Sequence, residues 1–413
     1  MGNDKNFFSV FKNLKEQVDR LPLSGNAKQK MKSRIIELKE LTIDAREPRI
    51  ALVGRRGAGK SSLINALFGE RRQATGSVQA GTGRGKWLWY PSDEEKKIRL
   101  LDSRGLGESE KPLKADEYSA VAQMKKEVKD DPPDVFLFLI KAKETDARVD
   151  EDLRELNDIR AFIRKAHSYD VPVICVVTQV DELDPPYYKQ LPLDGHPEKA
   201  KNIKAGVHLM EKRFKEHHIP LITTIPVCTY TDFDEDGNIV YDMRWNVDEL
   251  AAYLVDILPN DAKLKTAKAA KAVPAKKKAA QKIVATMSGM AVIIGIEPIP
   301  FADMPLLTAL QAIMIMAIAY ISGREISRAT AGEFIGALGV NFGVAFVVRE
   351  GVRSAAKMIP AAGNVLSGAV AGGVTYGIGQ AGIAYYIEGK DLKKAKQAFE
   401  REKKHFRKEQ EKE

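Results

Sequence analysis

Cysteine is nearly absent from this sequence of 413 residues, which contains only Cys175 and Cys228. Both lie inside apolar runs that we expect to form buried strands, so a disulfide-stabilised secreted scaffold is excluded and a reducing compartment is favoured. The amino-terminal residues are rich in charged side chains and lack a sustained apolar core, which indicates no cleaved secretory signal. His196, His217 and His218 have no cysteine or histidine partner at metal-ligand spacing, which argues against a zinc site. We therefore expect a cytoplasmic protein.

Length and net charge limit the number of domains and the kinds of partner that the chain can have. At about 150 residues per domain, the chain predicts two or three domains with a sizeable core. Its 65 lysines and arginines exceed its 56 aspartates and glutamates, which gives a formal net charge of +9. Such a chain is attracted to phosphates, anionic lipid or nucleic acid, and charge alone does not choose among them.

Changes in composition divide the chain into five predicted segments. A helical segment comes first, an α/β domain second and a Lys/Ala-rich basic linker or broken helix third. A hydrophobic, glycine-rich helical domain and a charged helix follow. The third segment has eight lysines and no acidic residue between Lys263 and Lys282. The predicted boundaries are 1–46, 47–260, 261–282, 283–389 and 390–413.

The second segment alternates short β-rich runs with helical stretches. This alternation predicts an α/β fold with a mostly parallel sheet flanked by crossover helices. An acidic loop is expected at 232–237, before a helix that closes the domain. The expected strands are 50–53, 86–90, 98–101, 135–140, 171–177 and 221–227.

The fourth segment contains four stretches without charge, of 14, 20, 15 and 30 residues, at 283–296, 304–323, 334–348 and 358–387. Since roughly 20 apolar residues span a bilayer, the second and fourth stretches are long enough to cross one. Small-residue spacings in this segment let helices approach closely. The glycines of 358–387 favour a hairpin broken near Gly372-Gly373 rather than one straight helix.

The run Gly54-Arg55-Arg56-Gly57-Ala58-Gly59-Lys60-Ser61 matches the pattern G-x-x-x-x-G-K-[ST]. It stands between the strand expected at 50–53 and a helix expected at 61–68, which is the context that this chemistry needs. The glycines let the backbone wrap around phosphates, whose charge the exposed N–H groups and the helix dipole hold. Lys60 is expected to reach the outer phosphates of a nucleotide, and Ser61 to bind Mg²⁺.

Two further motifs follow later strands. In Asp102-Ser103-Arg104-Gly105, Asp102 would hold Mg²⁺ through water, and the N–H of Gly105 would meet the γ-phosphate. In Thr178-Gln179-Val180-Asp181, the Asp181 carboxylate can accept hydrogen bonds from N1–H and the exocyclic amine of guanine, which adenine cannot offer. The three motifs together predict a guanine-nucleotide site.

This combination resembles the Era-like branch of the P-loop GTPases and, more loosely, the dynamin-like and immunity-related GTPases, over about residues 48–258. The resemblance implies a GTPase that binds GTP or GDP with Mg²⁺. It makes 178–181 a variant of the N/T-K-x-D motif, in which Gln179 replaces the lysine that covers the base, and Val227-Cys228-Thr229 a degraded fifth motif. The segment 80–84 is similar to the A-G-T-T-R segment of Era-like proteins, which makes Thr82 the expected sensor of Mg²⁺ and the γ-phosphate, with Thr75 as the alternative.

The predicted site residues fall into three overlapping groups. The catalytic residues are Lys60, Thr82, Gly105 and Arg56, and the metal ligands are Ser61, Thr82 and Asp102. The nucleotide-binding residues are Gly54, Gly57, Ala58, Gly59, Lys60, Ser61, Ser62, Thr178, Gln179, Asp181, Cys228 and Thr229.

Hydrolysis is predicted to be slow unless it is stimulated. Leu106 stands where many GTPases place a water-orienting glutamine, and leucine cannot orient water. Arg55, Arg56 and Arg104 are candidates to complete the site, because a guanidinium near the β/γ bridge stabilises charge in the transition state. Arg56 is the candidate that we carry forward, acting in cis or across a homodimer or larger oligomer of GTPase domains.

Residues 283–389 resemble the hydrophobic helical domain of unknown function that is appended to certain bacterial GTPases. The segments 298–303 and 359–364, each followed by an apolar run, carry this resemblance, which implies membrane association. The leading hypothesis is therefore a GTP-hydrolysing switch or remodeller at an anionic membrane. One alternative is a soluble GTP-dependent interaction protein with a buried helical bundle. The other is an RNA or ribosome assembly GTPase, although the chain has no GxxG RNA-binding module and no nucleic acid partner is expected.

Overall fold

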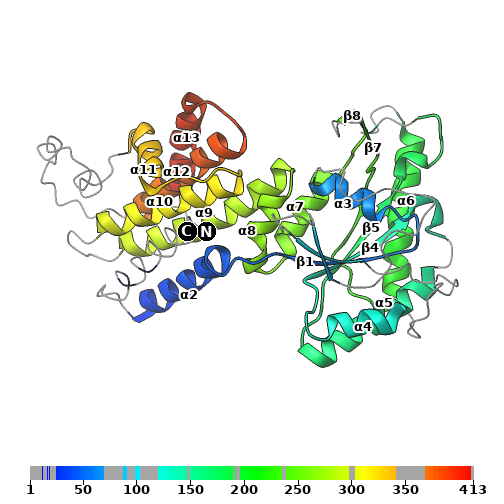
Figure 1. The fold of residues 1–413 in the computed structure, drawn as a ribbon. Helices are drawn as coiled ribbons and strands as arrows, with labels where there is room; N and C mark the ends of the chain where they lie inside the picture. Colours follow the sequence, from blue (N-terminus) through cyan, green and yellow to red (C-terminus); the bar gives the residue numbers. More distant parts are fainter. Residues whose placement is uncertain are drawn as a thin grey trace, which may run out of the picture. The chain divides into compact units, whose positions relative to one another are not determined.

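The structure, a computed structural model of the full sequence, consists of two compact units (Figure 1). The α/β unit comprises Glu47–Pro259 and Ala269–Ala275, and the helical unit comprises Met1–Arg46, Asn260–Lys268 and Lys276–Glu413. The residues that the structure describes are 12, 16, 18, 25–68, 87–90, 98–102, 120–146, 149–188, 191, 196–234, 239–296, 303–340 and 368–410.

A six-stranded sheet forms the centre of the α/β unit. Its strands, in the order β2-β3-β1-β4-β5-β6, are parallel except for β2, which pairs antiparallel with β3 at the edge. Because β1 pairs with β3 on one side and β4 on the other, its carboxyl end borders the crevice where such sheets bind ligands. The predicted mostly parallel α/β fold is confirmed. The bounds are β1 (Arg49–Val53), β2 (Trp87–Tyr90), β3 (Ile98–Asp102), β4 (Val135–Lys141), β5 (Val173–Thr178) and β6 (Thr223–Pro226).

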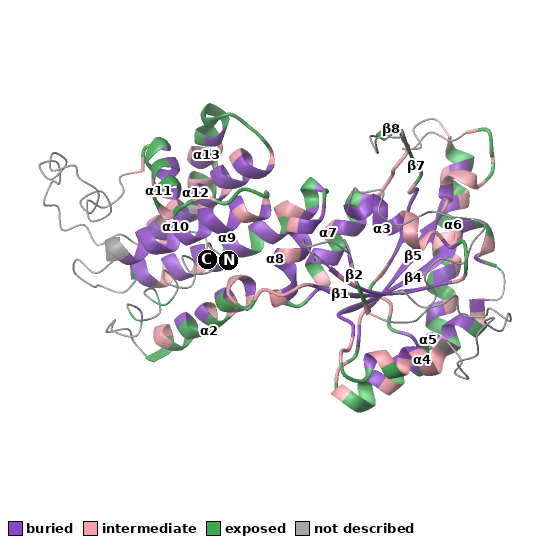
Figure 2. Cartoon of the chain, in the orientation of Figure 1, coloured by how far each residue is buried: buried purple, intermediate pink, exposed green. Residues whose placement is uncertain are grey.

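Helices cover both faces of the sheet because its central strands are apolar on both sides. On one face, α4 (Ala120–Val128), α5 (Val149–His167) and α6 (Pro197–Glu216) share a buried cluster with strand residues such as Phe138 and Cys175. On the other face, α3 (Lys60–Phe68) packs against α7 (Val247–Ile257). Figure 1 shows α3 and α7 above the sheet and α4 and α5 below it, and Figure 2 shows the central strands as buried.

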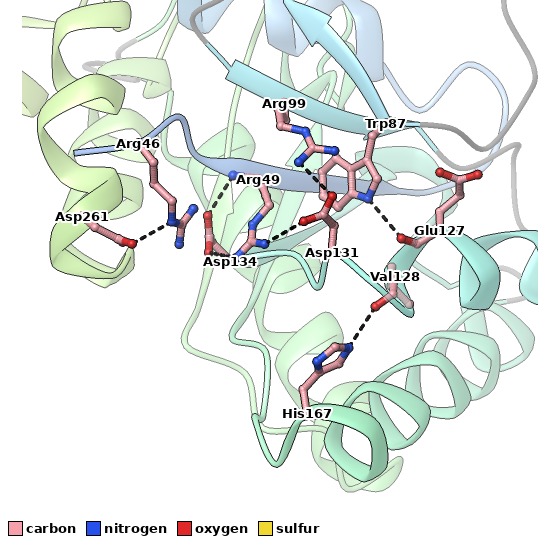
Figure 3. A network of polar contacts seen from close by, with 10 residues as sticks. All are labelled: Arg46, Arg49, Trp87, Arg99, Glu127, Val128, Asp131, Asp134, His167 and Asp261. Carbon is pink, nitrogen blue, oxygen red and sulfur yellow. Dashed lines mark hydrogen bonds and ion pairs between the residues drawn. The ribbon is translucent and has the colours of Figure 1, made fainter. Parts of the chain in front are cut away.

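Ionic contacts fasten the amino ends of β1 and β3 (Figure 3). Arg49 and Arg99 are register partners on these strands, and both donate to Asp131, over 3.3 and 3.0 Å. Asp134, which is buried, accepts a hydrogen bond from the backbone N–H of Arg49 at 2.8 Å. The Arg99 guanidinium also lies 5.2 Å from the centre of the Trp87 ring. This network stabilises the sheet at the end opposite the phosphate loop, which follows β1.

A small hairpin occupies part of the expected acidic loop. β7 (Thr231–Phe233) and β8 (Ile239–Asp242) pair antiparallel ahead of α7. Asp232 and Phe233 therefore lie in a strand, and the prediction of a loop there is wrong. The acidic composition of this stretch lowers its intrinsic strand propensity, which hid β7 from the sequence analysis.

The core of the helical unit is built around α10 (Asp303–Ile321). Every side chain from Leu306 to Ala319 is buried, and Figure 2 shows this helix almost entirely in the buried colour. The amide of Gln311 donates to the hydroxyl of Thr375 on α12 (Gly368–Gly382) at 3.1 Å, which gives each of these two buried side chains a partner inside the bundle. The other helices are α2 (Gly25–Thr42), α8 (Asn260–Ala269), α9 (Val273–Ile296), α11 (Arg328–Ala337), α12 (Gly368–Gly382) and α13 (Leu392–Gln410).

Glycines on α12 let its neighbours approach closely. A Cβ on Gly379 would lie 2.5 Å from a methyl of Val284 on α9, and one on Gly377 would lie 2.8 Å from the Phe399 carbonyl oxygen on α13. The predicted hairpin break near Gly372-Gly373 is wrong, because α12 runs through both residues as one helix. Close packing on both sides of the helix outweighs the low helix propensity of glycine.

The lysine-rich segment 261–282 is mostly helical. It lies in α8 and in the first part of α9, with a non-helical break at 270–272. Among the described residues, α9 is the one helix long and apolar enough to cross a membrane, and 61% of its most apolar window is buried within the protein. The sequence instead favoured 304–323 and 358–387. The described part of the first forms a shorter apolar helix, Leu306–Ile321, and residues 358–367 lie outside the described residues.

Candidate nucleotide-binding site

The loop that follows β1 has the backbone of a phosphate-binding loop. It joins the carboxyl end of β1 to Lys60, the first residue of α3. A Cβ on Gly54 would lie 2.4 Å from the carbonyl oxygen of Leu139 on β4, closer than two such atoms can approach. Gly57 and Gly59 have φ angles of +78° and +85°. That left-handed conformation costs other residue types about 1 to 2 kcal/mol. The three glycines are therefore required for the loop to lie against β4 and turn into α3.

Three polar side chains open α3. The Lys60 ammonium lies 2.6 Å from the Gly54 carbonyl oxygen and 3.2 Å from that of Arg55, so it folds back over its own loop. Ser61 and Ser62 follow in the first helical turn and are half-buried. The first N–H groups of a helix have no partner within it and carry the positive end of its dipole. A helix amino terminus beside a lysine and two hydroxyls is an arrangement suited to phosphate.

The Thr-Gln-x-Asp motif begins at the end of strand β5 and contacts the same loop. Thr178 ends β5 and is 0% exposed; its hydroxyl lies 2.9 Å from the Ala58 carbonyl oxygen and 3.2 Å from that of Ile140 on β4. Gln179, at φ +57°, donates from its side-chain amide to the Gly57 carbonyl oxygen at 3.0 Å. The motif and the phosphate loop are thus joined by two side chains that are 120 and 122 residues distant from their acceptors in sequence.

Asp181 follows in a single 3₁₀ turn, η2 (Val180–Glu182), and is half-buried. Its backbone carbonyl oxygen accepts a hydrogen bond from the ammonium of Lys199 on α6 at 2.5 Å. The structure therefore places the predicted base-reading residue directly beyond the two residues that bond to the phosphate loop.

Lys199 is a site residue that the sequence analysis missed. It is 0% exposed, which is rare for a lysine. A sequence signal existed, because Lys199 falls at helical spacing on the apolar face of α6. The other buried residues of that face are Ile203, Met210 and Phe214.

The two loop arginines differ in their surroundings. Arg55 makes a two-pronged ion pair with Asp152 on α5, over 2.8 and 3.0 Å, and this hydrogen bonding raises the pKa of Arg55. Arg56 is exposed to solvent. The structure thus holds Arg55 against α5 and leaves the side chain of Arg56 exposed.

The degraded fifth motif lies beyond β6. Cys228 is fully buried and forms a β-bridge with Trp245, in which each backbone N–H donates to the other residue's carbonyl oxygen, over 3.2 and 3.0 Å. Thr229 is half-buried. The backbone N–H and the thiol of Cys228 are therefore turned into the protein, and Thr229 is the member of this pair with surface that could face a base.

Several predicted site residues cannot be placed. Thr82, its alternative Thr75, Arg104, Gly105 and Leu106 lie outside the described residues. The backbone of Asp102 ends β3 opposite Leu52 of β1, beside the start of the phosphate loop, and its side chain is not among those described. The roles assigned to these residues stay predictions.

Comparison with known families agrees with this geometry. A family model described as 50S ribosome-binding GTPase matches residues 49–179, from the start of β1 to Gln179. A second family model, described as a domain of unknown function (DUF697), matches residues 260–410. The chain therefore carries a domain of a GTPase family followed by a DUF697 domain. The family resemblances inferred from the motifs are thereby confirmed.

Individual relatives match about a third of this chain. The tRNA modification GTPase MnmE of Halorhodospira halophila is 35% identical over 32% of this chain and 25% of its own length. GTPase Era of Lactobacillus delbrueckii subsp. bulgaricus is 29% identical over 33% of this chain and 40% of its own. The chain thus spans less than half the length of these curated relatives. A crystal structure of Aquifex aeolicus Era bound to GDP·AlF4⁻ is 24% identical, with a TM-score of 0.31 over 62% of this chain and 69% of that one.

Proposed function

We propose that this GTPase binds GTP at the carboxyl ends of β1 and β5 and acts as a nucleotide-dependent switch. The observation that carries the proposal is the bonding of Thr178 and Gln179 to the phosphate loop. Because these bonds join the phosphate loop to the base-reading motif, one nucleotide can be held at its phosphates and at its base by a single rigid unit. The Asp181 carboxylate accepts hydrogen bonds from the guanine edge and gives the site its preference for guanine over adenine.

The phosphate end has a defined division of roles. Lys60, which now contacts carbonyl oxygens of its own loop, turns to the β- and γ-phosphate oxygens. The Ser61 hydroxyl, in the first turn of α3, fits the position of a Mg²⁺ ligand beside those phosphates, and Asp102 and Thr82 are the further proposed ligands. When bound, Mg²⁺ neutralises charge that develops on the phosphates. The N–H of Gly105 is the proposed γ-phosphate contact.

We place this switch at an anionic membrane. Two observations support that location: α9 is long and apolar enough to span a bilayer, and the lysine-rich segment that includes the first part of α9 exposes Lys271, Lys278 and Lys282. A lysine near an anionic surface contributes on the order of 1 kcal/mol at low salt. The nucleotide state would change the loops around Thr82 and 102–105 and so the contacts of the helical unit.

A soluble, GTP-dependent interaction protein is the second candidate, and the burial of α10 favours it. A helix that is apolar all round and buried from Leu306 to Ala319 is what the core of a large soluble domain requires. In that case the glycines of α12 serve close packing alone. The description of the matching family model names the 50S ribosome, which makes a ribosomal or RNA partner the remaining alternative.

One experiment tests chemistry and location together. Turnover of GTP and ATP by the purified full-length protein is measured with and without liposomes containing anionic lipid, and flotation of the protein is measured in parallel. The proposal predicts GTP-specific turnover that rises with anionic liposomes, and flotation that survives high salt if helices insert. Flotation that salt abolishes, and that substitution of glutamine for Lys271, Lys278 and Lys282 also abolishes, indicates binding by the lysines.

Two outcomes assign the protein elsewhere. A detergent-free, monodisperse protein that floats with no lipid in any nucleotide state supports the soluble interaction protein. Cosedimentation with 50S subunits that depends on GTP, together with salt-dependent RNA binding, supports the ribosomal alternative. The variant Lys60→Ala serves as the nucleotide-binding control in each assay.

A further inference from the structure

We propose that Lys199 is a positioning residue for guanine recognition, which holds the backbone of Asp181 so that the Asp181 carboxylate meets the base. The proposal rests on the nucleotide site proposed above. It concerns a residue on a different element, α6, that lies 18 positions along the chain from its acceptor.

The ammonium of Lys199 is the centre around which the loop after β5 folds. It donates to the backbone carbonyl oxygens of Asp181 and Tyr188, each at 2.5 Å, and to that of Pro185 at 3.4 Å. A lysine ammonium has three N–H donors, so these three carbonyls match its full capacity. The loop from Asp181 to Tyr188 is thus tied at both of its ends to one buried charge.

Other side chains of α6 and its start hold the same loop. Asn202, one turn beyond Lys199, donates from its amide to the Asp184 carbonyl oxygen at 3.1 Å. The Tyr188 ring lies 3.4 Å from the ring of His196, the residue before α6, measured between ring centres. On the other side of Asp181, Gln179 is bonded to the phosphate loop. The 3₁₀ turn that carries Asp181 is therefore fixed from both directions.

The cost of this arrangement points to a role in recognition. An apolar residue at position 199 would fit the buried face of α6, whereas a buried ammonium carries a desolvation penalty unless its hydrogen bonds are satisfied. The N–H donors of Lys199 are satisfied by carbonyl oxygens of the loop that carries Asp181. Two hydrogen bonds from the guanine edge to one carboxylate require that carboxylate to be placed within a fraction of an ångström.

The test compares guanine with hypoxanthine, because inosine nucleotides lack the exocyclic amine and keep N1–H. Dissociation constants of GDP and IDP are measured by calorimetry on the full-length protein. In the wild type, loss of one hydrogen bond to a carboxylate predicts that IDP binds roughly tenfold to a hundredfold more weakly than GDP. In Lys199→Met, which keeps the length of the side chain and removes its donors, the ratio of the two constants should fall to about threefold or less.

Two controls separate positioning from stability. Lys204→Met changes an exposed lysine on the same helix and should leave the GDP-to-IDP ratio unchanged. In an Asp181→Ala background, Lys199→Met should cause no further loss of GDP affinity, because the residue acts through Asp181. Equal weakening of GDP and IDP by Lys199→Met, or an additional loss in the Asp181→Ala background, would overturn the proposal.

A second variant keeps the test decisive if Lys199→Met does not fold. Asn202→Ala removes only the hydrogen bond to the Asp184 carbonyl oxygen. Because it loosens the same loop, it should lower the ratio of the IDP and GDP dissociation constants by roughly twofold to fivefold. An unchanged ratio in a folded Asn202→Ala protein would then count against the proposal. Failure of the underlying site is seen separately: a wild type that binds ADP as tightly as GDP has no guanine recognition for Lys199 to support.

Discussion

The hydroxyl of Thr178 offers the sharpest test of the link between the base-reading motif and the phosphate loop. Thr178 is fully buried at the end of β5, and its hydroxyl has one proton to share between Ala58 O at 2.9 Å and Ile140 O at 3.2 Å. Thr178→Val keeps the shape of the side chain and removes that donor. The change therefore removes one of the two side-chain hydrogen bonds between the motif and the phosphate loop, without opening a cavity.

The expected magnitude follows from the loss of one buried donor. A buried carbonyl left without its partner costs about 1 to 3 kcal/mol, and the nearer acceptor, Ala58, lies in the phosphate loop itself. For a unit of this size each kcal/mol lowers Tm by roughly 2 to 4 °C. Because the released loop must be reordered by the nucleotide, we expect GDP to bind about tenfold more weakly, which corresponds to about 1.4 kcal/mol.

Calorimetric GDP titration and thermal unfolding of the full-length protein measure both effects. Thr178→Ser, which retains the hydroxyl, should bind GDP within about threefold of the wild type. Thr145→Val removes another buried hydroxyl of the α/β unit, 3.2 Å from the Ala142 carbonyl oxygen in its own turn, and should lower Tm without changing GDP affinity. A Thr178→Val protein with wild-type GDP affinity would refute the idea that this bond couples the two motifs.

Four further predictions concern single residues. Lys60→Ala should abolish tight GTP binding, because it removes the ammonium aimed at the β- and γ-phosphates, and unchanged affinity by calorimetry would contradict the phosphate-site assignment. Asp181→Asn should lower affinity for GTP and raise it for xanthosine triphosphate, measured by competition, and equal loss for both would count against base reading. Arg56→Ala should lower kcat much more than nucleotide affinity, and equal losses would make Arg56 a binding residue. Hydrogen bonds from two lysines hold the pKa of Glu388 below its ordinary value, so its stabilisation is present above the unfolded pKa and lost as pH falls through the folded one. Glu388→Gln should therefore lower Tm at pH 7 and not at strongly acidic pH, and a deficit independent of pH would contradict this.

The DUF697 domain shows what composition alone leaves open. The charge-free stretches 304–323 and 358–387 are long enough to cross a bilayer, but the side chains of α10 from Leu306 to Ala319 are buried, and α12 is a single helix through Gly372-Gly373. An apolar helix has the same sequence pattern whether it faces lipid or other apolar helices. Contacts such as that of Gly379 with Val284 exist only once the helices are packed.

The sequence by itself determined the local motifs of this protein and the elements next to them. The phosphate loop, the strands around it and the motif from Thr178 to Asp181 depend on neighbouring residues, because a glycine turn between a strand and a helix acts within one short segment. The match of residues 49–179 to a GTPase family agrees with that analysis.

The tertiary structure alone decided which distant residues support the site. Lys199 became part of it because α6 packs beside the loop after β5, and Arg55 was drawn away from it by Asp152 on α5. Hydrogen bonds and ion pairs between elements depend on how crossover helices dock on the sheet, and apolar periodicity predicts which face docks but not which polar atoms then meet. The sequence shows that Lys199 and Arg55 are present, but only the fold buries the lysine beside the loop and ties the arginine to Asp152.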